Sequence, residues 1–248
     1  VLDETLKVVE VTPYRTEGIY TDKRRPDTVS FHAKLSDDLK RRDFTINAIA
    51  YDDSKGHVID PYKGQGDIKD KIIRTVGDPY DRFHEDALRI IRAVRLSASL
   101  GFMINVETQE AIQKTAPNLK EIAMERIRDE FSKMIMSSNP MIGVVMCEKL
   151  GLLEYIAPDL KRGIDIEQNG DHIYTVWEHN LRALQHSADR DWPLHVRLAA
   201  LFHDISKPET RRWSEEKKDW TFYGHDVVGG RVTKKALEQL KYPKKIVE

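Results

Sequence analysis

Residues 85–95, EDALRIIRAVR, constrain the fold most, because they combine an apolar stripe with charges at helical spacing. Asp86 and Arg89 are three residues apart, so on one helix they would lie side by side. The apolar residues predict that another face of this helix is buried: Leu88, Ile91 and Val94. We therefore expect a central amphipathic helix that presents a carboxylate and a guanidinium together.

The Asp86–Arg89 pair has two interpretations. One is an ordinary ion pair on a solvated helix face. The other is a base-reading pair, since a carboxylate accepts from an exocyclic amino group and a guanidinium donates to a ring nitrogen. That pattern complements the Watson–Crick edges of cytosine and adenine. Uracil and guanine present a ring N–H and a carbonyl there, so they would be rejected without any template.

Composition limits the remaining possibilities. The 248 residues can form one large domain or two smaller ones. Lys+Arg 40 against Asp+Glu 41 gives a net charge of −1, so the overall charge does not indicate whether the chain binds nucleic acid, and any basic surface must be local. The single cysteine, Cys147, excludes a disulfide framework and a cysteine-ligated zinc site, and it suits a reducing cytoplasm. We expect Cys147 to be a small buried apolar residue.

No apolar run approaches the roughly 18 residues of a membrane span, and no signal peptide is recognisable, so a cytoplasmic protein is expected.

The first 60 residues have the pattern of a small α/β unit. Leu6–Pro13 alternates like a strand, a helix is expected to begin at Ser36, and residues 51–53 and 57–60 predict a hairpin around a Ser54–Gly56 turn. The chain opens on Val1 without an initiator Met, within the first predicted unit. We expect this end to be cut, or to be completed by another polypeptide.

Residues 38–50, DLKRRDFTINAIA, closely resemble the Arg-Arg-Asp motif of the class II tRNA nucleotidyltransferases. This family comprises the CCA-adding enzymes, the bacterial poly(A) polymerases and the split A-adding and CC-adding enzymes. The resemblance implies that Arg41 and Arg42 bind nucleotide phosphates, that Asp43 binds the sugar hydroxyls and that Asn47 braces this loop. The residue types suit these roles, because Arg binds phosphate in bidentate fashion and a carboxylate accepts from ribose hydroxyls.

Two further segments resemble motifs of the same family. Residues 78–95 match its Glu-Asp-x-x-Arg motif, which implies that Asp86 and Arg89 read the incoming CTP or ATP. Glu85 is expected to position its neighbours, and other arginines are candidates for phosphate contact or for bracing the reader: Arg82, Arg92 and Arg95. Residues 125–130, ERIRDE, resemble a neck motif that supports the base reader, so a structural role is expected for Glu125, Arg126 and Arg128.

The last third of the chain resembles the HD superfamily. His179 and the His203–Asp204 pair match its metal-ligand pattern, which implies a possible divalent metal site. His225 lies where many HD proteins also have a histidine, but the distal aspartate of the pattern is not identifiable. A metal-dependent phosphohydrolase and a helical body that supports tRNA therefore both remain open. A basic stretch near the end is either an RNA-backbone contact or a solvated helix face: Lys234, Lys235, Lys241, Lys244 and Lys245.

One feature of the family is not found. Its transfer chemistry uses an Asp-x-Asp pair on a strand to hold two Mg2+ ions, and no such pair occurs on a predicted strand here. It is expected upstream of residue 1, so catalytic residues are not assigned and this chain alone is expected to be inactive. Glu10 is either an accessory carboxylate near those metals or an ordinary strand residue.

The prediction is therefore a mostly α protein with a small α/β N-terminal part. Its expected domains are the remnant of a nucleotidyltransferase head (1–62), a base-reading and neck region (63–160) and an incomplete HD-like helical region (161–248). The expected activity is template-independent addition of C, A or both to a tRNA 3′ end, by attack of the RNA 3′-hydroxyl on the α-phosphate of CTP or ATP. Expected partners are tRNA, CTP and ATP, with a second polypeptide or a missing N-terminal segment to complete the active site, and no membrane. A phosphohydrolase and a non-catalytic RNA-binding body are the alternatives.

Overall fold

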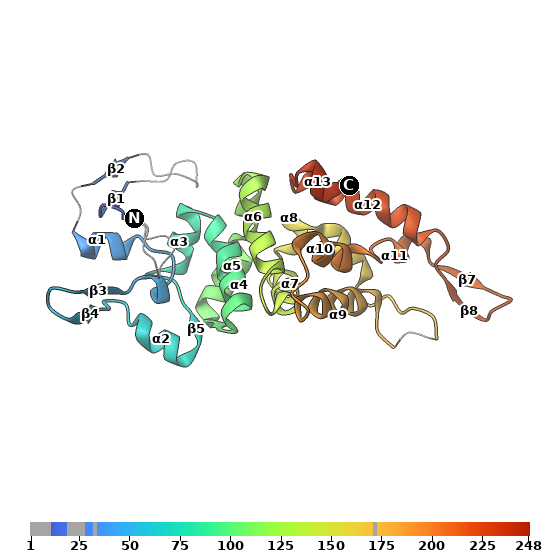
Figure 1. Cartoon of the computed structure of the whole chain (residues 1–248), viewed down its shortest axis with the longest axis horizontal. Coiled ribbons are helices and arrows are strands. Elements are labelled where there is room, and N and C mark those ends of the chain that lie inside the picture. Colours follow the sequence, from blue (N-terminus) through green and yellow to red (C-terminus); the bar gives the residue numbers. More distant parts are fainter. Residues whose placement is uncertain (1–10, 19–27, 32–33, 171–172) are drawn as a thin grey trace.

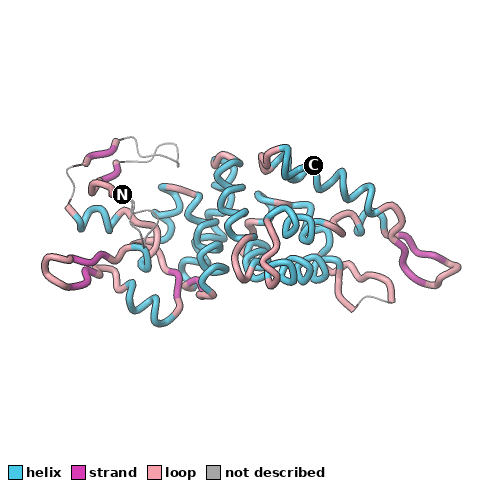
Figure 2. The backbone as a smooth tube through the Cα atoms, viewed as in Figure 1, coloured by secondary structure: helices cyan, strands magenta, loops and turns pink. Residues whose placement is uncertain are grey.

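A computed structural model describes residues 11–18, 28–31, 34–170 and 173–248. The molecule extends along one axis, with a small α/β part at one end, helices in the middle and a second helical part at the other end (Figure 1). Strands occur as short pairs between helices and loops (Figure 2). The predicted mostly α fold with a small N-terminal α/β part is confirmed. Glu10 and most of the predicted strand Leu6–Pro13 lie outside the described residues, and residues 11–13 form no strand.

The N-terminal part is built from short elements around a hairpin. They are β1 (Thr16–Glu17), β2 (Val29–Ser30), α1 (Leu35–Lys40), the 3-10 helix η1 (Thr45–Asn47), β3 (Ala50–Asp52), β4 (His57–Ile59) and α2 (Gly64–Asp70). β3 and β4 pair antiparallel with Ala50 opposite Ile59, which confirms the predicted hairpin.

The helix expected to begin at Ser36 is shorter than its apolar pattern indicated. α1 includes Leu35 and ends at Lys40, because the chain beyond it pairs with a distant segment. Phe44 is bridged to Thr75, and the Thr45 N–H donates to the Arg74 carbonyl at 2.9 Å. Phe44 is fully buried. This long-range pairing places Phe44 in an extended conformation, and the chain bends at Asp43 instead of continuing the helix.

The middle of the molecule is a helical bundle centred on α4 (Leu88–Leu100). Ile90, Ile91 and Val94 of α4 are fully buried. The surrounding elements are β5 (Ile72–Ile73), α3 (Pro79–Glu85), β6 (Met103–Ile104), α5 (Val106–Thr115), η2 (Ala116–Glu121), α6 (Met124–Ile135), α7 (Pro140–Lys149), α8 (Leu153–Ile156) and η3 (Pro158–Gly163). β5 and β6 pair in parallel, while α6 and α7 pack against α4.

The single helix expected over residues 85–95 is wrong. α3 ends at Glu85, Asp86 is extended (φ −140, ψ 103), and α4 begins at Leu88. The Asp86 side chain accepts the Leu88 N–H at 3.1 Å. Aspartate competes with the helix by bonding nearby backbone donors, so it favours a helix start over a helix interior. Asp86 therefore lies in the link between two helices.

The C-terminal part packs a second group of helices against the bundle. Its elements are α9 (Val176–Ala188), α10 (Leu194–Phe202), α11 (Lys207–Thr210), β7 (Arg212–Ser214), β8 (Asp219–Thr221), α12 (His225–Gln239) and α13 (Lys244–Val247). The chain end returns to α6, where Arg128 donates to the Lys241 carbonyl at 2.5 Å and the Ser132 and Tyr242 hydroxyls are 2.7 Å apart. The β7–β8 hairpin projects at the end of the molecule far from α1 (Figure 1).

One hydrophobic cluster runs from Phe44 in the N-terminal part to Tyr242 near the C-terminus. It includes Cys147, whose predicted burial is confirmed, and burial raises the pKa of this thiol to about 12. The predicted domain boundaries at residues 62 and 160 stay predictions. None of the helices among the described residues combines the length and apolar character needed to cross a membrane.

Candidate functional site

Arg41 and Arg42 are held together by one buried carboxylate. Asp38 accepts Arg41 Nη2 at 2.5 Å and Arg42 Nη2 at 2.9 Å. Burial by itself would raise the pKa of Asp38, but its hydrogen bonds and ion pairs with the two arginines outweigh this and lower it. Arg42 donates to Asp38 through Nε and Nη2, so its guanidinium, which carries five N–H donors, keeps donors for a phosphate. The Arg42 side chain is 42% exposed.

Both carboxylate oxygens of Asp43 have hydrogen-bond partners. Its Oδ1 accepts the Asn47 side-chain amide at 3.0 Å and the Phe44 N–H at 2.9 Å. Its Oδ2 lies 2.8 Å from Arg92 Nε and 2.6 Å from Arg92 Nη2. Burial opposes ionisation of Asp43, but the Arg92 charge and these hydrogen bonds hold its pKa below the ordinary value. The carboxylate that is predicted to bind ribose is thus ionised and oriented.

Three arginines of α3 and α4 contact residues of the segment 40–43. Arg82 Nη1 donates to the Lys40 carbonyl at 3.3 Å, and Arg89 Nη2 donates to the Arg41 carbonyl at 3.1 Å. Arg92 completes the series by its ion pair with Asp43. The two sequence motifs, about 45 residues apart, therefore form one continuous site.

Glu85 forms ion pairs with two of these arginines and so holds their side chains in place. Its carboxylate oxygens lie 2.5 Å from Arg82 Nη2 and 2.6 Å from Arg89 Nη1. A cavity of about 240 Å³ beside this group is lined by Glu85, Arg82, Arg41 and Lys40, among others. The cavity brings residues of both motifs to one surface that is rich in guanidinium groups.

Asp86 and Arg89 are each engaged by protein partners. Asp86 Oδ2 pairs with Arg126 Nη2 of α6 at 3.0 Å, while Arg89 is 8% exposed and bonded to Glu85. They do not form the side-by-side pair on one helix face that the sequence predicted. The sequence also gave Arg126 no partner, because the spacing within ERIRDE places it on a helix but carries no information on which distant carboxylate it meets.

Arg95 lies away from this group. Its Nε is 2.6 Å from Glu130 Oε2, and Glu130 also pairs with Lys133 at 3.0 Å. Glu130 is buried. Arg95 therefore joins α4 to α6 in the structure, and both predicted roles of Arg95 stay predictions.

His179, His203 and Asp204 converge at the far end of the molecule. His179 Nε2 is 3.0 Å from His203 Nε2, and Asp204 Oδ2 is 3.5 Å from His179 Nε2 and 3.3 Å from His203 Nε2. Across residues 11–18, 28–31, 34–170 and 173–248, this is the one group of at least three histidine, cysteine or acidic side chains whose donor atoms lie within 4.8 Å. Two imidazoles and a carboxylate fit a divalent transition metal.

Lys207 and His225 complete the surroundings of Asp204. Lys207 Nζ lies 2.7 Å from Asp204 Oδ2, and His225 Nε2 lies 3.6 Å from Asp204 Oδ1. Burial would raise the pKa of Asp204, but His203 and Lys207 outweigh it and hold the pKa well below its usual range. Burial likewise opposes charging of His203, yet Asp204 raises the pKa of that imidazole. The sequence pattern predicts the histidines of this group but not Lys207.

Comparisons with known proteins match three separate parts of the chain. The family models "Poly A polymerase head domain", "Probable RNA and SrmB- binding site of polymerase A" and "HD domain" match residues 1–74, 101–164 and 169–248. Residues 75–100, which include Asp86 and Arg89, lie between the first two matches.

The similar proteins are longer than this chain. It is 37% identical over 224 residues to the A-adding tRNA nucleotidyltransferase of Deinococcus radiodurans, covering 88% of this chain and 51% of that protein. It is 48% identical over 151 residues to a CCA-adding enzyme of Ligilactobacillus salivarius, covering 61% and 35% respectively. The solved CCA-adding enzyme of Bacillus stearothermophilus in complex with CTP matches with a TM-score of 0.56 at 30% identity, covering 94% of this chain and 60% of that one. The chain thus spans about half the length, or less, of these curated relatives.

Proposed function

Since the chain belongs to the family of tRNA nucleotidyltransferases and poly(A) polymerases, we propose that it forms the nucleotide-recognising part of an enzyme that adds C, A or both to tRNA 3′ ends. The observation that carries this proposal is the contact of Arg82, Arg89 and Arg92 with residues 40–43. Those contacts combine the predicted phosphate and ribose ligands with the predicted base reader in one site. The relatives' names agree with this class of reaction.

The proposed roles concern first the triphosphate and then the ribose of the nucleotide. Arg41 and Arg42 bind the triphosphate, because Asp38 fixes both guanidiniums and a guanidinium binds phosphate in bidentate geometry. Asp43 accepts from the ribose hydroxyls and is kept ionised by Arg92. Asn47 and Arg92 act on Asp43 instead of on the nucleotide.

Base selection is assigned to Asp86 and Arg89. An ionised carboxylate has about four lone-pair sites. Asp86 accepts one hydrogen bond from the Leu88 N–H and two from Arg126, so about one site is left for the amino group of cytosine or adenine. Arg89 donates to Glu85 and to the Arg41 and Arg82 carbonyls. The base's ring nitrogen replaces one of these acceptors when the nucleotide binds.

The bond-forming step is attack of the RNA 3′-hydroxyl on the α-phosphate, with pyrophosphate leaving. Bound Mg2+ ions would activate the hydroxyl and neutralise the leaving group. The described residues beside Asp43 offer no cluster of three candidate ligands for such ions. This chain's own contribution is therefore to bind, orient and select the nucleotide.

Calorimetric titration of the chain with CTP, ATP, UTP and GTP tests the proposal. CTP and ATP are expected to bind more tightly than UTP and GTP, and Asp86→Ala is expected to remove the preference. Asp53→Ala, in the exposed turn of the β3–β4 hairpin, is the matched control and should keep it. Tight tRNA binding without nucleotide binding would instead support a non-catalytic RNA-binding body.

A second candidate function rests on the His179–His203–Asp204 group. This group is proposed to bind a divalent metal, as the HD-type alternative requires, and binding would displace Lys207 from Asp204. Addition of Mn2+ should raise the thermal unfolding midpoint of the wild type but not of His179→Gln. An equal rise in both proteins would place the ion elsewhere and remove the basis for a phosphohydrolase.

A further inference from the structure

A hollow of about 490 Å³, the α4 hollow, lies among Ser97 in the last turn of α4, Ile104 of β6, Gln109 of α5 and Met146 of α7. These helices are in the middle of the molecule (Figure 1). The volume is in the range of small-molecule sites, which are about 300–1,000 Å³. At a rise of about 1.5 Å per residue, Ser97 lies about 12 Å from Arg89 along α4, so the α4 hollow is separate from the nucleotide site.

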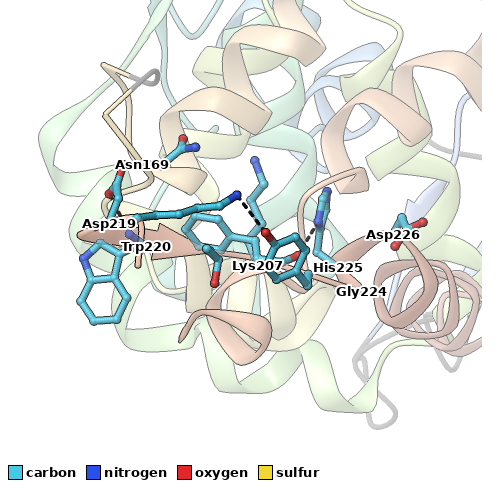
Figure 3. Close-up of a pocket in the computed structure, with 11 residues that line it drawn as sticks. Asn169, Lys207, Asp219, Trp220, Gly224, His225 and Asp226 are labelled. Carbon is cyan, nitrogen blue, oxygen red and sulfur yellow. Dashed lines mark hydrogen bonds between the residues drawn. The ribbon is translucent and has the colours of Figure 1, made fainter. Parts of the chain in front are cut away.

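Another hollow, of about 600 Å³, lies beside the β7–β8 hairpin and differs in character. Figure 3 shows Lys207 and His225 in it, with Asp219 and Asp226 toward its two ends. Lys207 and His225 both contact Asp204, so this hollow belongs to the His-Asp group already described. None of the described residues that line the α4 hollow carries a charge or lies in that group.

The lining of the α4 hollow is mostly apolar. Its polar side chains, among the described residues, are those of Ser97, Asn105 and Gln109. Met103 and Val106 also line it and are 71% and 66% exposed. An apolar ligand would remove these side chains from water, which is favourable. A nucleic-acid backbone is not suited to this surface, because its phosphates would meet no cation.

Two side-chain amides in the lining are oriented by backbone groups. Asn105 Oδ1 accepts the Thr108 N–H at 3.3 Å as the N-cap of α5, so Asn105 Nδ2 is the donor end. Gln109 Nε2 donates to the Ile104 carbonyl at 2.6 Å, so Gln109 Oε1 is the acceptor end. Among the residues that the structure describes, neither Nδ2 nor Oε1 has a further partner. The α4 hollow therefore offers one fixed donor and one fixed acceptor about one helical turn apart.

We propose that the α4 hollow binds a small, flat, uncharged aromatic amide. The ring lies against the apolar lining, while the amide oxygen accepts from Asn105 Nδ2 and the amide N–H donates to Gln109 Oε1. A neutral amide carries an acceptor and a donor side by side, whereas a carboxylate only accepts and an ammonium group only donates. Mostly apolar concavities with a few placed polar groups are typical of small-molecule sites. This inference is independent of the proposed nucleotide function.

Binding of 2-naphthamide, followed by ligand-observed NMR titration, tests the proposal. Wild type should bind 2-naphthamide about tenfold more tightly than naphthalene, because the amide adds two hydrogen bonds. It should also bind 2-naphthamide more tightly than 2-naphthoate, because a carboxylate cannot donate to Gln109. Saturating CTP should not displace 2-naphthamide, since the α4 hollow is separate from the nucleotide site.

Asn105→Asp isolates the donor. Aspartate caps a helix as well as asparagine does, so the unfolding temperature should not change. It replaces the donor by an acceptor, so 2-naphthamide should bind about tenfold more weakly while naphthalene binds as before. Gln109→Met should weaken 2-naphthamide binding similarly. Gln113→Met is the matched control, because Gln113 also donates to a backbone carbonyl, that of Lys149 at 3.3 Å, but does not line the α4 hollow.

Four results would overturn the proposal. They are a failure of 2-naphthamide to bind, equal affinity for 2-naphthamide and naphthalene, wild-type affinity in both Asn105→Asp and Gln109→Met, and displacement by CTP. A leucine-containing peptide amide that binds more tightly than 2-naphthamide would assign the α4 hollow to a protein partner and would also overturn it. Tight, amide-dependent binding that is lost in Asn105→Asp and kept in Gln113→Met supports it.

Discussion

Asp43 shows how single residues of the nucleotide site are prepared for binding. It is 8% exposed, yet the Arg92 guanidinium, the Asn47 amide and the Phe44 N–H keep it charged. The motif resemblance identified the residue types, and chemistry explained why they suit phosphate and ribose. The resemblance could not identify Arg92 as the partner of Asp43 or Arg126 as the partner of Asp86, because residue spacing carries no information on contacts between distant segments.

Protonation of Asp43 should destabilise the fold at low pH. Its pKa is lower in the folded chain than in the unfolded chain, so its contribution to stability is present above pH about 3.9 and is lost as pH falls through the folded value. Urea unfolding at pH 6 and pH 3 should show a smaller loss of stability for Asp43→Asn than for wild type. Asp53→Asn, at an exposed position, should follow the wild type. Equal pH dependence in all three proteins would contradict this assignment.

Arg126 should act on base selection through Asp86. Arg126→Met removes the 3.0 Å ion pair that orients the carboxylate, so the preference for CTP over UTP should fall about tenfold, which corresponds to about 1.4 kcal/mol. Arg126→Lys should restore part of it. Arg128→Met is the control on the same helix, because Arg128 contacts Asp129 and the Lys241 carbonyl instead. An unchanged ratio in Arg126→Met would rule out this positioning role.

At the scale of elements, apolar periodicity predicted which segments are helical better than where they end. The sequence also predicts helices over residues 107–114 and 123–135, and both are present, as α5 and α6. The pattern continues through Asp86 without a break, so the end of α3 could not be predicted from it. The apolar residues of 140–153 likewise predict one further helix, but the structure divides this segment, since Gly151 adopts a left-handed φ of 75° between α7 and α8. In both cases local capping and backbone conformation outweigh periodicity.

Two glycines in α2 should respond oppositely to alanine. A Cβ on Gly64 would lie 2.2 Å from the Thr45 carbonyl oxygen, which is backbone and cannot move without displacing η1. Gly64→Ala should therefore destabilise the chain by about 2 kcal/mol or more. Gly66 has no heavy atom within 4 Å of such a Cβ, so Gly66→Ala should stabilise by about 0.5–1 kcal/mol through helix propensity. Thermal unfolding of both variants checks this, and a harmless Gly64→Ala would contradict the packing of α2 on η1.

At the scale of the whole molecule, buried polar contacts join segments that lie far apart in the sequence. Arg197 of α10 is 3% exposed and donates to the Ile135 and Ser137 carbonyls at the end of α6 and to the Trp192 carbonyl after α9. The sequence predicted three regions and their order. It could not predict this connection, because an arginine in an apolar helix is equally compatible with a solvated position.

Replacement of Arg197 by methionine should destabilise the whole chain. The apolar substitute leaves buried carbonyls without donors, at a cost of about 3 kcal/mol or more. Arg231→Met, at an exposed position on α12, should change stability by about 0.5 kcal/mol at most. Denaturant unfolding of the two variants distinguishes the effects. Similar midpoints would show that Arg197 does not connect the two helical parts.

The central claim is that Asp86 selects the base, and nucleotide affinity of Asp86→Asn tests it most directly. Asparagine keeps an oxygen that can accept the Leu88 N–H, and it adds an amide donor that can reach the carbonyl of uracil or guanine. The ratio of UTP to CTP dissociation constants should be large in wild type and should fall toward one in Asp86→Asn, with stability unchanged. A ratio that stays at its wild-type value would show that Asp86 only caps α4 and that the base is read elsewhere.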